Sequence, residues 1–513
     1  MSGVRYLIDT NVFIGLEDSR EVAPDFASFR QLAARHGVGV FIHEAAKDDI
    51  ARDKDDARRR ISLSKIAKFP TIAKVRGLTN ADLEAEFGGL SRPNDVVDTT
   101  LLHALRIGVV DFLVTEDGGL HDRARRYASG IADRVLFVAD ATALLRSTYE
   151  PQEVQFRYVE EVDAHTIPTT DPIFESLREG YPQFDTWWRD SCVAKLRKCW
   201  VVTDNDGLAG LVVRKDETAT NTDATLPGER ILKICTFKVR PERRGLKLGE
   251  LLLKQILWFA QKNGYDVLYL TTYPEQTALI SLIEYYGFCR TKVADDGELT
   301  FEKGLSRLPL ACENGADLFE VAARSYPRFC ADSTVAAYGI PIQEDYHEVL
   351  FPELRDDRQQ DLFEFGGIGT GPRKAGNTIR KVYLCHAPAN LSERGALLFF
   401  YKGQSERMPS QAITTVGIFE NMALARSTDE LRRLAGGRSV YSERQLQSWN
   451  ASPKNPVKVI NFLLAGHLSP AMQIDELRRA GVISKQPPQS IFKLDHTRRA
   501  PLLARLDLGF SLQ

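Results

Sequence analysis

A basic stretch that contains glycines, Arg240–Gly249, lies between two segments of different periodicity. It has three arginines, one lysine and two glycines, and it follows an apolar β-branched run and precedes a helical pattern. Backbone N–H groups at the start of a helix bind anions, and neighbouring cationic side chains strengthen that binding. The stretch therefore predicts a pyrophosphate site. An ordinary helix start with a solvated basic face is the alternative.

Four acidic residues form a second set with chemical potential, because each follows a short apolar segment or lies on a helix beside one. They are Asp9, Glu44, an acidic residue of the stretch Asp95–Arg106 and one of the pair Glu116-Asp117. Carboxylates gathered at one edge of a sheet repel each other unless cations neutralise them, and Mg²⁺ or Mn²⁺ prefers oxygen ligands. Such ions activate water for phosphodiester cleavage. Strand-end caps and solvated charges are the alternative, since Asp and Glu make up 69 of the 513 residues.

The basic stretch is flanked by elements that would position it. The pattern predicts strands at Ile231–Val239 and Val267–Thr271, a helix at Glu250–Lys262, an earlier helix at Phe184–Arg197, and a hairpin of Trp200–Val202 with Leu208–Val213. Gly264 stands where a helix C′ residue is expected. We expect a mixed sheet with helices that places the basic stretch at the end of a strand.

The acidic residues belong to a separate α/β pattern in residues 1–150. Strands are expected at Val4–Ile8, Gly39–Ile42, Phe112–Thr115 and Val135–Val138, with a helix at Asp95–Arg106. In open parallel sheets, ligands bind at the carboxyl ends of the strands. The pattern predicts that the four carboxylates meet at that edge.

Residues 156–303 resemble the GNAT acyltransferase family, through Arg244-Gly245-Leu246-Lys247-Leu248-Gly249 and the closing Tyr285-Tyr286-Gly287-Phe288. The resemblance implies that acetyl-CoA lies between two diverging strands. The residues implied to hold it are Phe237, Val239, Arg244, Gly245, Leu246, Lys247, Leu248 and Gly249.

Two positions depart from the GNAT pattern. Lys247 replaces the usual middle glycine, and Ile283 stands where many members have a tyrosine that acts as the acid. Tyr286 is the nearby candidate for the catalytic acid, with core packing as its alternative role. A domain that binds CoA without transferring acetyl therefore stays open.

Residues 5–143 resemble the PIN-domain ribonucleases, through the segments LIDTNVFI, FIHEAAKDDI, NDVVDTTLLHAL and FLVTEDGGLHDRA. The resemblance implies that Asp9, Glu44, Asp98 and Asp117 are catalytic and bind Mg²⁺ or Mn²⁺, with Asn11 and Thr115 as helpers and Asp95 one helical turn before Asp98. It implies two-metal cleavage of RNA. The arginines at 58–60, 123, 125 and 126 would meet phosphates, or are solvated faces.

The last part of the chain mixes short strands and helices. Strands are expected at Arg380–Cys385, Ala396–Tyr401, Ala412–Glu420, Val457–Leu463 and Ser490–Leu494, and helices at Thr428–Leu434, Ser442–Trp449 and Pro470–Ala480. The segments GNTIRKVYLCHAP, GALLFFYKG and ITTVGIFENM resemble the PUA-like superfamily in its ASCH or EVE branch, which implies a small β-barrel with helices that binds RNA. The implied pocket residues are His386, Tyr401, Lys402, Trp449 and Asn450, with a basic rim of Arg373, Lys374, Arg380 and Lys381. Core packing is the alternative for each aromatic residue.

The composition is that of a soluble globular protein, with 43% hydrophobic and 27% charged residues and a net charge of −2. Seven scattered cysteines without a C-x-x-C pair predict reduced thiols and a cytoplasmic location. The amino-terminal residues do not form a signal peptide, and no apolar run is long enough to span a membrane.

Together these patterns predict a multidomain α/β protein. A PIN-like domain spans residues 1–150, a GNAT-like domain 151–307, a connector 308–344 and a PUA-like domain 345–513. The predicted function is an acetyl-CoA-dependent N-acetyltransferase, fused to a metal-dependent ribonuclease and an RNA-binding domain. Its expected acceptor is RNA or an amine that RNA carries, for example on tRNA. A toxin-like or defence role with a cognate protein partner would fit. Alternatives are a ribonuclease regulated by CoA and a non-catalytic nucleic-acid-binding scaffold.

Overall fold

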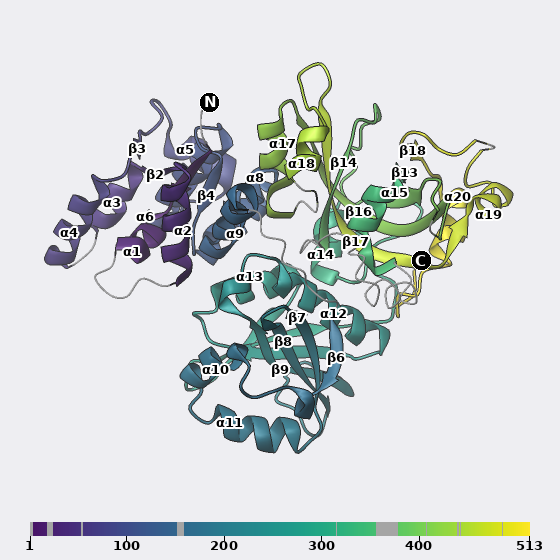
Figure 1. Cartoon of the computed structure of the whole chain (residues 1–513), viewed down its shortest axis with the longest axis horizontal. Coiled ribbons are helices and arrows are strands. Elements are labelled where there is room, and N and C mark those ends of the chain that lie inside the picture. The colour runs from purple at the N-terminus through teal and green to yellow at the C-terminus, as the bar shows by residue number, and fades with distance from the viewer. Residues whose placement is uncertain are drawn as a thin grey trace.

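The chain forms three lobes in sequence order. A computed structural model describes residues 4–17, 24–52, 55–150, 159–313, 315–354, 378–406, 408–438, 441, 443–484 and 486–512. Figure 1 shows the amino-terminal lobe in purple and blue, the central lobe in teal, and the carboxy-terminal lobe in green and yellow. Each lobe contains one sheet, and the predicted multidomain α/β class is confirmed.

The amino-terminal domain is an open parallel sheet with the order β3-β2-β1-β4-β5. Its elements are β1 (Arg5–Ile8), α1 (Thr10–Glu17), α2 (Pro24–Arg35), β2 (Gly39–His43), α3 (Ala45–Ala51), α4 (Asp56–Ile66), β3 (Thr71–Ile72), α5 (Asn80–Phe87), α6 (Pro93–Arg106), β4 (Phe112–Val114), α7 (Gly118–Tyr127), α8 (Ser129–Ala132), β5 (Val135–Leu136) and α9 (Val138–Tyr149). Helices pack on both faces, because alternate residues of a strand point to opposite sides. Tyr6 and Ile8 join one core layer and Leu7 the other.

The central domain is a seven-stranded mixed sheet with the order β11-β12-β10-β9-β8-β7-β6. Its elements are β6 (Glu160–Asp163), η1 (Ala164–Thr166), η2 (Pro172–Phe174), α10 (Glu175–Gly180), α11 (Phe184–Trp187), η3 (Trp188–Val193), β7 (Lys198–Asp204), β8 (Gly207–Thr218), β9 (Arg230–Val239), η4 (Pro241–Arg243), α12 (Leu248–Lys262), β10 (Val267–Thr272), α13 (Thr277–Tyr285), β11 (Cys289–Val293) and β12 (Leu299–Gly304). The helix predicted over Phe184–Arg197 is shorter, since α11 passes into the π-helical turn η3.

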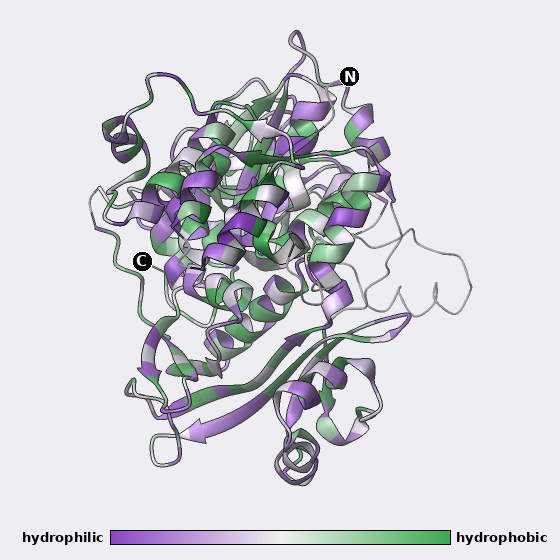
Figure 2. Ribbon diagram, turned by 90° about the vertical axis from the view of Figure 1, so that its left-hand side faces the viewer, coloured by the Kyte–Doolittle hydropathy of each residue, from purple (hydrophilic) through white to green (hydrophobic). Residues whose placement is uncertain are grey.

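Helices cover both faces of the central sheet. Trp200 and Val202 of β7 pack under α12, whereas Cys199 and Val201 face the side of α10 and α11. The apolar residues of these long strands are green in Figure 2. In Figure 1, α12 and α13 lie on the side of the central lobe that faces the other two lobes.

The carboxy-terminal domain is a six-stranded sheet with the order β14-β17-β16-β15-β13-β18. The elements after β12 are α14 (Leu318–Ser325), β13 (Ala337–Ile342), α15 (Glu344–Leu350), η5 (Pro352–Leu354), β14 (Arg380–Cys385), β15 (Leu397–Lys402), β16 (Ala412–Ala425), α17 (Thr428–Ala435), η6 (Gly436–Arg438), α18 (Glu443–Ser448), β17 (Val457–Gln473), α19 (Ile474–Arg479), β18 (Phe492–Lys493) and α20 (His496–Leu503). Its strand pairings across the described ranges do not join β14 to β18, so the predicted barrel closure stays a prediction.

Two expectations for this domain are corrected. The stretch 308–344, expected to be a connector, contains β13, which pairs with β15 inside the third sheet. The helix predicted from Pro470 begins only at Ile474, because β17 continues to Gln473 and pairs there with β16. Apolar residues on both faces of these buried strands conceal the two-residue period that identifies a strand.

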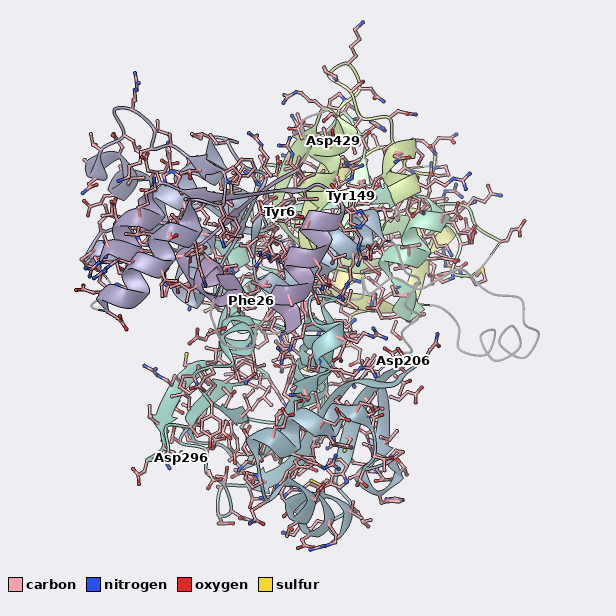
Figure 3. All side chains as sticks on the ribbon, turned by 60° about the vertical axis from the view of Figure 1, so that its left-hand side comes forward. Tyr6, Phe26, Tyr149, Asp206, Asp296 and Asp429 are labelled. Atoms are coloured by element: carbon pink, nitrogen blue, oxygen red, sulfur yellow. A yellow bond between two sulfur atoms is a disulfide. The ribbon has the colours of Figure 1, made fainter. Side chains whose placement is uncertain are left out.

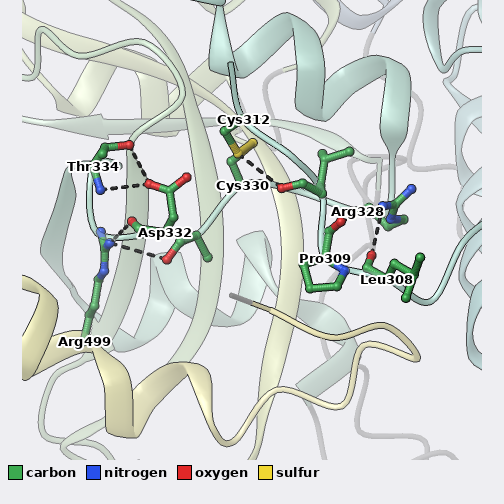
Figure 4. The surroundings of a disulfide bond; sticks show 10 residues. Leu308, Pro309, Cys312, Arg328, Cys330, Asp332, Thr334 and Arg499 are labelled. Atoms are coloured by element: carbon green, nitrogen blue, oxygen red, sulfur yellow. Dashed lines mark hydrogen bonds between the residues drawn. A yellow bond between two sulfur atoms is a disulfide. The ribbon is translucent and has the colours of Figure 1, made fainter. Parts of the chain in front are cut away.

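A disulfide corrects the expectation of reduced thiols for one pair of cysteines. Cys312 and Cys330 are bonded, and the other five cysteines are free. Figure 4 shows this bond beside Arg328, which donates to the carbonyl of Leu308, and near Arg499, which donates to the carbonyl of Asp332. The bond ties two points of the segment that joins the second and third sheets. None of the helices within the described ranges has the length and apolarity needed to cross a lipid bilayer.

Arg380 lies where the three domains meet. Its guanidinium pairs with Glu420 of its own domain and with Asp133 of the amino-terminal domain, at 2.5 and 3.1 Å. Its backbone N–H donates to Glu250 of α12 at 2.7 Å. Arg380 and Lys381 are both buried, which corrects their assignment to a basic surface rim; Arg373 and Lys374 lie outside the described residues.

Candidate active site

Two neighbouring parallel strands of the central sheet diverge at their carboxyl ends. β9 pairs with β10 from Ile231 only as far as Ile234, which is opposite Leu270. Beyond that point β9 stays paired with β8 up to Val239, and β10 stays paired with β12 up to Thr272. Backbone groups between the diverging strands therefore lack a ladder partner, and an extended ligand can use them. Phe237 and Val239, predicted to contact the cofactor, both lie on this stretch of β9.

The turn predicted to bind pyrophosphate lies at the same edge and begins α12. Lys247 adopts a left-handed backbone with φ 62°, and the first helical hydrogen bond runs from Leu251 N–H to Lys247 C=O at 3.0 Å. The amides of Leu248, Gly249 and Glu250 therefore have no intrahelical acceptor. A Cβ at Gly249 would lie 3.4 Å from Leu282 and 3.9 Å from Phe237, so the space above this glycine is open but narrow. The turn fits an anion bound by backbone N–H groups.

The cations of this turn are already paired with carboxylates. Arg240 and Arg243 both bind Asp204, at 2.8 and 2.5 Å. Asp206 accepts from Arg243 at 2.6 Å, and both acidic residues come from the hairpin between β7 and β8. Burial opposes ionisation of Asp204, but the hydrogen bond from Arg243, the N–H of Asp206 and the two guanidinium charges outweigh it, so the pKa of Asp204 is lowered. These two arginines hold the hairpin against the turn.

The other two cations of the turn reach the amino-terminal domain. Lys247 Nζ lies 2.6 Å from Asp140 Oδ1 of α9, and Arg244 lies 3.5 Å from Asp25 of α2. Gly245, with φ 77°, lies against the backbone of Ala139. A left-handed backbone costs a residue other than glycine about 1 kcal/mol. The left-handed backbone of Lys247 belongs to the central domain, whereas Asp140, the ion-pair partner of its side chain, belongs to the amino-terminal domain.

Tyr286, predicted as a catalytic acid, lies in the core. Its side chain is 1% exposed, and its hydroxyl donates to Glu250 at 3.1 Å. Burial raises the pKa of Tyr286 well above its ordinary value, and the charge of Glu250 adds to this. This placement matches the alternative role of packing at a helix end. Ile283 is fully buried as well, so the usual tyrosine position carries no proton donor.

Other groups surround the end of β10. Tyr273 follows this strand, and its ring lies 6.2 Å from the ring of Tyr181, which comes from the segment between α10 and α11. The turn between β11 and β12 adds Asp296, whose carboxylate is 3.5 Å from the hydroxyl of Tyr273, and Glu298. The charge of Asp296 is the main cause that raises the pKa of Tyr273, and burial followed by the charge of Glu298 raises that of Tyr181. These acidic residues were not predicted as part of the site, although the sequence contains the acidic pair Asp295-Asp296 in a hairpin turn. Figure 3 shows Asp296 and Asp206 at opposite edges of the central domain.

At the carboxyl edge of the amino-terminal sheet, three of the four predicted carboxylates interact. Burial raises the pKa of Asp98 to about 7, and the charges of Asp9 and Asp117 add to it. Burial also raises the pKa of Asp9 to about 6, against hydrogen bonds from Thr115 Oγ1 and the amide of Thr10. Asn11, predicted as a helper, donates to Thr115 at 3.2 Å. Asp9, Asp98 and Asp117 thus influence one another electrostatically, and their catalytic role stays a prediction.

Glu44 is directed elsewhere. Its carboxylate accepts from the N–H of Lys74 at 3.3 Å, on the side of β3. Asp49 of α3, rather than Glu44, contributes its charge to Asp9. The signal was available, because Asp49 lies four and three residues after the buried Ala45 and Ala46 and so shares their helix face.

The remaining predicted groups near this edge are structural. Asp95 is buried and pairs with Arg92 and Arg123, each at 3.1 Å, and Arg125 donates to Ser281 of α13 at 2.7 Å. Arg123 and Arg125 are therefore engaged within the protein, whereas Arg60 and Arg126 are exposed. Within the described ranges, no group of three or more His, Cys, Asp or Glu side chains is arranged to hold a metal ion. The described residues therefore do not offer a set of three or more side-chain ligands for the expected Mg²⁺ or Mn²⁺.

The predicted RNA-binding residues divide into two pairs. The ring centroids of His386 and Trp449 lie 5.3 Å apart, and those of Tyr346 and Trp449 also lie 5.3 Å apart. Tyr401 and Lys402 are 1% and 2% exposed on β15 and lie in the interior. We call His386, Trp449 and Tyr346 the aromatic shelf. Asn450 is exposed beside it.

Comparison with known proteins bears on the central domain. Residues 162–288 match the acetyltransferase (GNAT) family. The central domain is a GNAT domain. Over 86 residues the chain is 36% identical to an uncharacterized N-acetyltransferase of Schizosaccharomyces pombe. This aligned stretch covers 16% of this chain and 53% of the relative. The chain thus spans about half the length of the curated relative that it matches.

Solved structures similar to parts of the chain include an ASCH structure and an acetyltransferase. The crystal structure of ASCH from Zymomonas mobilis is 14% identical, with a TM-score of 0.24, over 33% of this chain and 95% of that one. The IAA acetyltransferase from Bacillus cereus is 14% identical, with a TM-score of 0.22, over 29% of this chain and 99% of that one. The PIN-like and PUA-like assignments stay predictions.

Proposed function

We propose that this protein transfers the acetyl group of acetyl-CoA to an amine at the diverging ends of β9 and β10. The amine is cationic in solution, and its nitrogen attacks the thioester only after it has lost one proton to solvent. One observation carries the proposal: the strands separate after Ile234 and Leu270 at the same sheet edge where the amides of Leu248 and Gly249 lack acceptors. The family match supports this assignment. Acetyl-CoA, when bound, supplies a thioester carbonyl that an amine can attack.

The residues of the GNAT domain would each have a defined part. The amides that begin α12 would hold the pyrophosphate, and Phe237 would line the path between the strands. Free backbone N–H groups of β9 would stabilise negative charge that develops on the carbonyl oxygen. The pKa of Tyr273 is raised, so its phenol stays protonated at neutral pH and can donate a proton to the departing thiolate.

The acceptor follows from the charges beyond β10. Asp296 and Glu298 would attract an ammonium group and repel the phosphates of RNA. An RNA-carried amine, such as the amino group of an aminoacyl-tRNA, fits only if another surface holds the RNA. The aromatic shelf would be such a surface, since His386 is exposed, Trp449 and Tyr346 are half-buried, and aromatic rings stack on unpaired bases. Lysine side chains and polyamines need no second surface.

Acetyl transfer is tested with labelled acetyl-CoA and three acceptors: a lysine-rich peptide, spermidine and aminoacyl-tRNA. The expected result is label on at least one amine, with Gly249→Glu inactive because a carboxylate would face the pyrophosphate. Tyr273→Phe should lower kcat about 10-fold with little change in KM if the phenol donates the proton. Absence of transfer to all three, with CoA still bound, would favour the alternative in which CoA is only a regulator.

A second candidate function rests on the convergence of Asp9, Asp98 and Asp117 with Asp49. Burial raises the pKa of two of these carboxylates, Asp9 and Asp98, and perturbed carboxylates that lie near one another are candidates for a functional site. We propose RNA cleavage by the amino-terminal domain as this second activity. Incubation of RNA with Mn²⁺ and the wild-type protein should then yield fragments that Asp117→Asn does not produce. Equal cleavage by the wild type and Asp117→Asn, or cleavage by neither, would contradict a ribonuclease activity of this domain.

A further inference from the structure

The cofactor turn of the GNAT domain contacts the amino-terminal domain. Gly245 lies so close to α9 that a Cβ there would be 2.3 Å from the carbonyl oxygen of Ala139 and 2.8 Å from the Cβ of Ala143. Lys247 and Asp140 pair at 2.6 Å, with each side chain 21% exposed. Two positions of the turn, in addition to Arg244, therefore depend on a domain that the GNAT fold does not include.

Lys247 is the critical position, because its backbone is left-handed where side chains other than glycine are disfavoured. Its amide and those that follow begin α12 and face the expected pyrophosphate. The ammonium group is held against α9 by Asp140, so it is not available to fold back over these amides. The ion pair thus fixes both the backbone of the turn and the direction of the side chain.

We infer that Asp140 is a positioning residue for acetyl-CoA, and that the amino-terminal domain completes the cofactor site through α9. This inference rests on the proposed function. The direction in which CoA affinity changes on mutation of Asp140 distinguishes positioning from simple electrostatics. Asp140 carries a negative charge close to a site for an anion, so simple electrostatics predicts that removing the charge tightens CoA binding. Positioning of Lys247 predicts the opposite.

The test is a double-mutant cycle with CoA as the titrant, followed by calorimetry on the full chain. Asp140→Asn should weaken binding about 10-fold, a cost of about 1.4 kcal/mol. Lys247→Gly should bind within about 3-fold of wild type, because glycine adopts the left-handed backbone without a partner. The double variant should match Lys247→Gly, since Asp140 then has nothing to position.

A matched control separates this role from general docking of the domains. Arg433 of α17 pairs with Asp111 of the amino-terminal domain at 2.8 Å, far in sequence from the turn. Arg433→Gln breaks that contact without touching the turn, so it should leave CoA affinity unchanged. Melting curves of all variants confirm that each is folded.

Each other outcome overturns the inference. Tighter binding by Asp140→Asn would show that Asp140 repels the cofactor, and unchanged binding would show that it has no part. A 10-fold loss in Lys247→Gly would make Lys247 a direct ligand. Equal losses in Asp140→Asn and Arg433→Gln would assign the effect to docking in general. Failure of the wild type to bind CoA would instead refute the proposed function itself.

Discussion

At the start of α12 each cationic side chain meets a carboxylate, whereas at the edge of the amino-terminal sheet carboxylates face one another. In the first region Asp204 serves both Arg240 and Arg243, and Asp140 serves Lys247. In the second, Asp9 and Asp98 have raised pKa values because burial and neighbouring negative charge act together. The turn is electrically balanced, and the acidic edge is not.

This difference separates two ways of building a site. In the balanced turn the cationic side chains are already paired with carboxylates, so backbone amides would bind the anion. These amides do not change their charge with pH. At the acidic edge, Asp98 and Asp9 take up protons as the pH falls through about 7 and about 6, which relieves the repulsion. A bound cation would have to displace these protons. The turn should therefore be insensitive to pH near neutrality, and the acidic edge sensitive.

The largest expected effect comes from breaking the balance at the turn. Asp204→Ala leaves Arg240, whose side chain is 7% exposed, and Arg243 without their shared partner. Removing one member of a buried ion pair typically lowers the free energy of unfolding by about 3–5 kcal/mol. A fall in melting temperature measures it. Asp206→Ala, whose side chain is 68% exposed, should lose less than about 1 kcal/mol. Equal losses would contradict the balanced-turn account.

A smaller loss is expected when the turn is pushed away from α9. Gly245→Ala places a methyl group where only 2.3 Å separates it from the carbonyl oxygen of Ala139, and φ 77° is unfavourable for alanine. We expect a loss of about 2 kcal/mol, since small-to-large changes in packed sites cost about 1–3 kcal/mol. Gly297→Ala, also at positive φ but with nothing within 4 Å, measures the backbone contribution alone. Matching losses would show that the contact with α9 is loose.

The acidic edge should respond to mutation with the opposite sign. The folded pKa of Asp98 is about 7, above its ordinary value of 3.8, so the folded state binds more protons and loses stability as pH rises between these values. Asp98→Asn should be close to wild type in stability at pH 4 and more stable at pH 8, by on the order of 4 kcal/mol. Urea or thermal unfolding at both pH values checks this.

Asp95, one helical turn away, is the matched control. Burial opposes its ionisation, but hydrogen bonds from Arg92 and Ser91 and the charge of Arg123 lower its pKa. Its ion pairs stabilise the fold above the ordinary carboxyl pKa and are lost in acid. Asp95→Asn should therefore destabilise the protein at pH 8. If both variants shifted stability in the same direction, the acidic edge would not be a region of unrelieved repulsion.

The sequence predicted these regions to different depths. The strands beside the turn follow from apolar periodicity, and the parallel sheet expected in the amino-terminal domain was confirmed. Asp9 and Asp117 were expected together because each follows a strand, and Asp98 because it lies on a helix expected beside the sheet. The carboxylate of Glu44 points toward the amide of Lys74, and helix geometry shows that Asp49 of α3 shares a face with the buried Ala45 and Ala46.

Contacts between domains could not be predicted in the same way. Lys247 and Asp140 are 107 residues apart, and Arg380 and Asp133 are 247 apart, with no local pattern that links them. Tyr401 and Tyr286 have aromatic side chains that suit either a core or a site, and only the packing decides. The disulfide likewise depends on a close approach of Cys312 and Cys330 that spacing alone does not reveal.

Calorimetric titration of CoA into the wild-type protein and into Gly249→Glu tests the central claim most directly. The account predicts one site per chain in the wild type and no detectable binding in the variant, because the added carboxylate would face the diphosphate beneath Leu282 and Phe237. Both proteins should melt at similar temperatures, which shows that the turn is still folded. Equal affinity in the two proteins, or no binding in either, would contradict a cofactor site built from the amides at the start of α12.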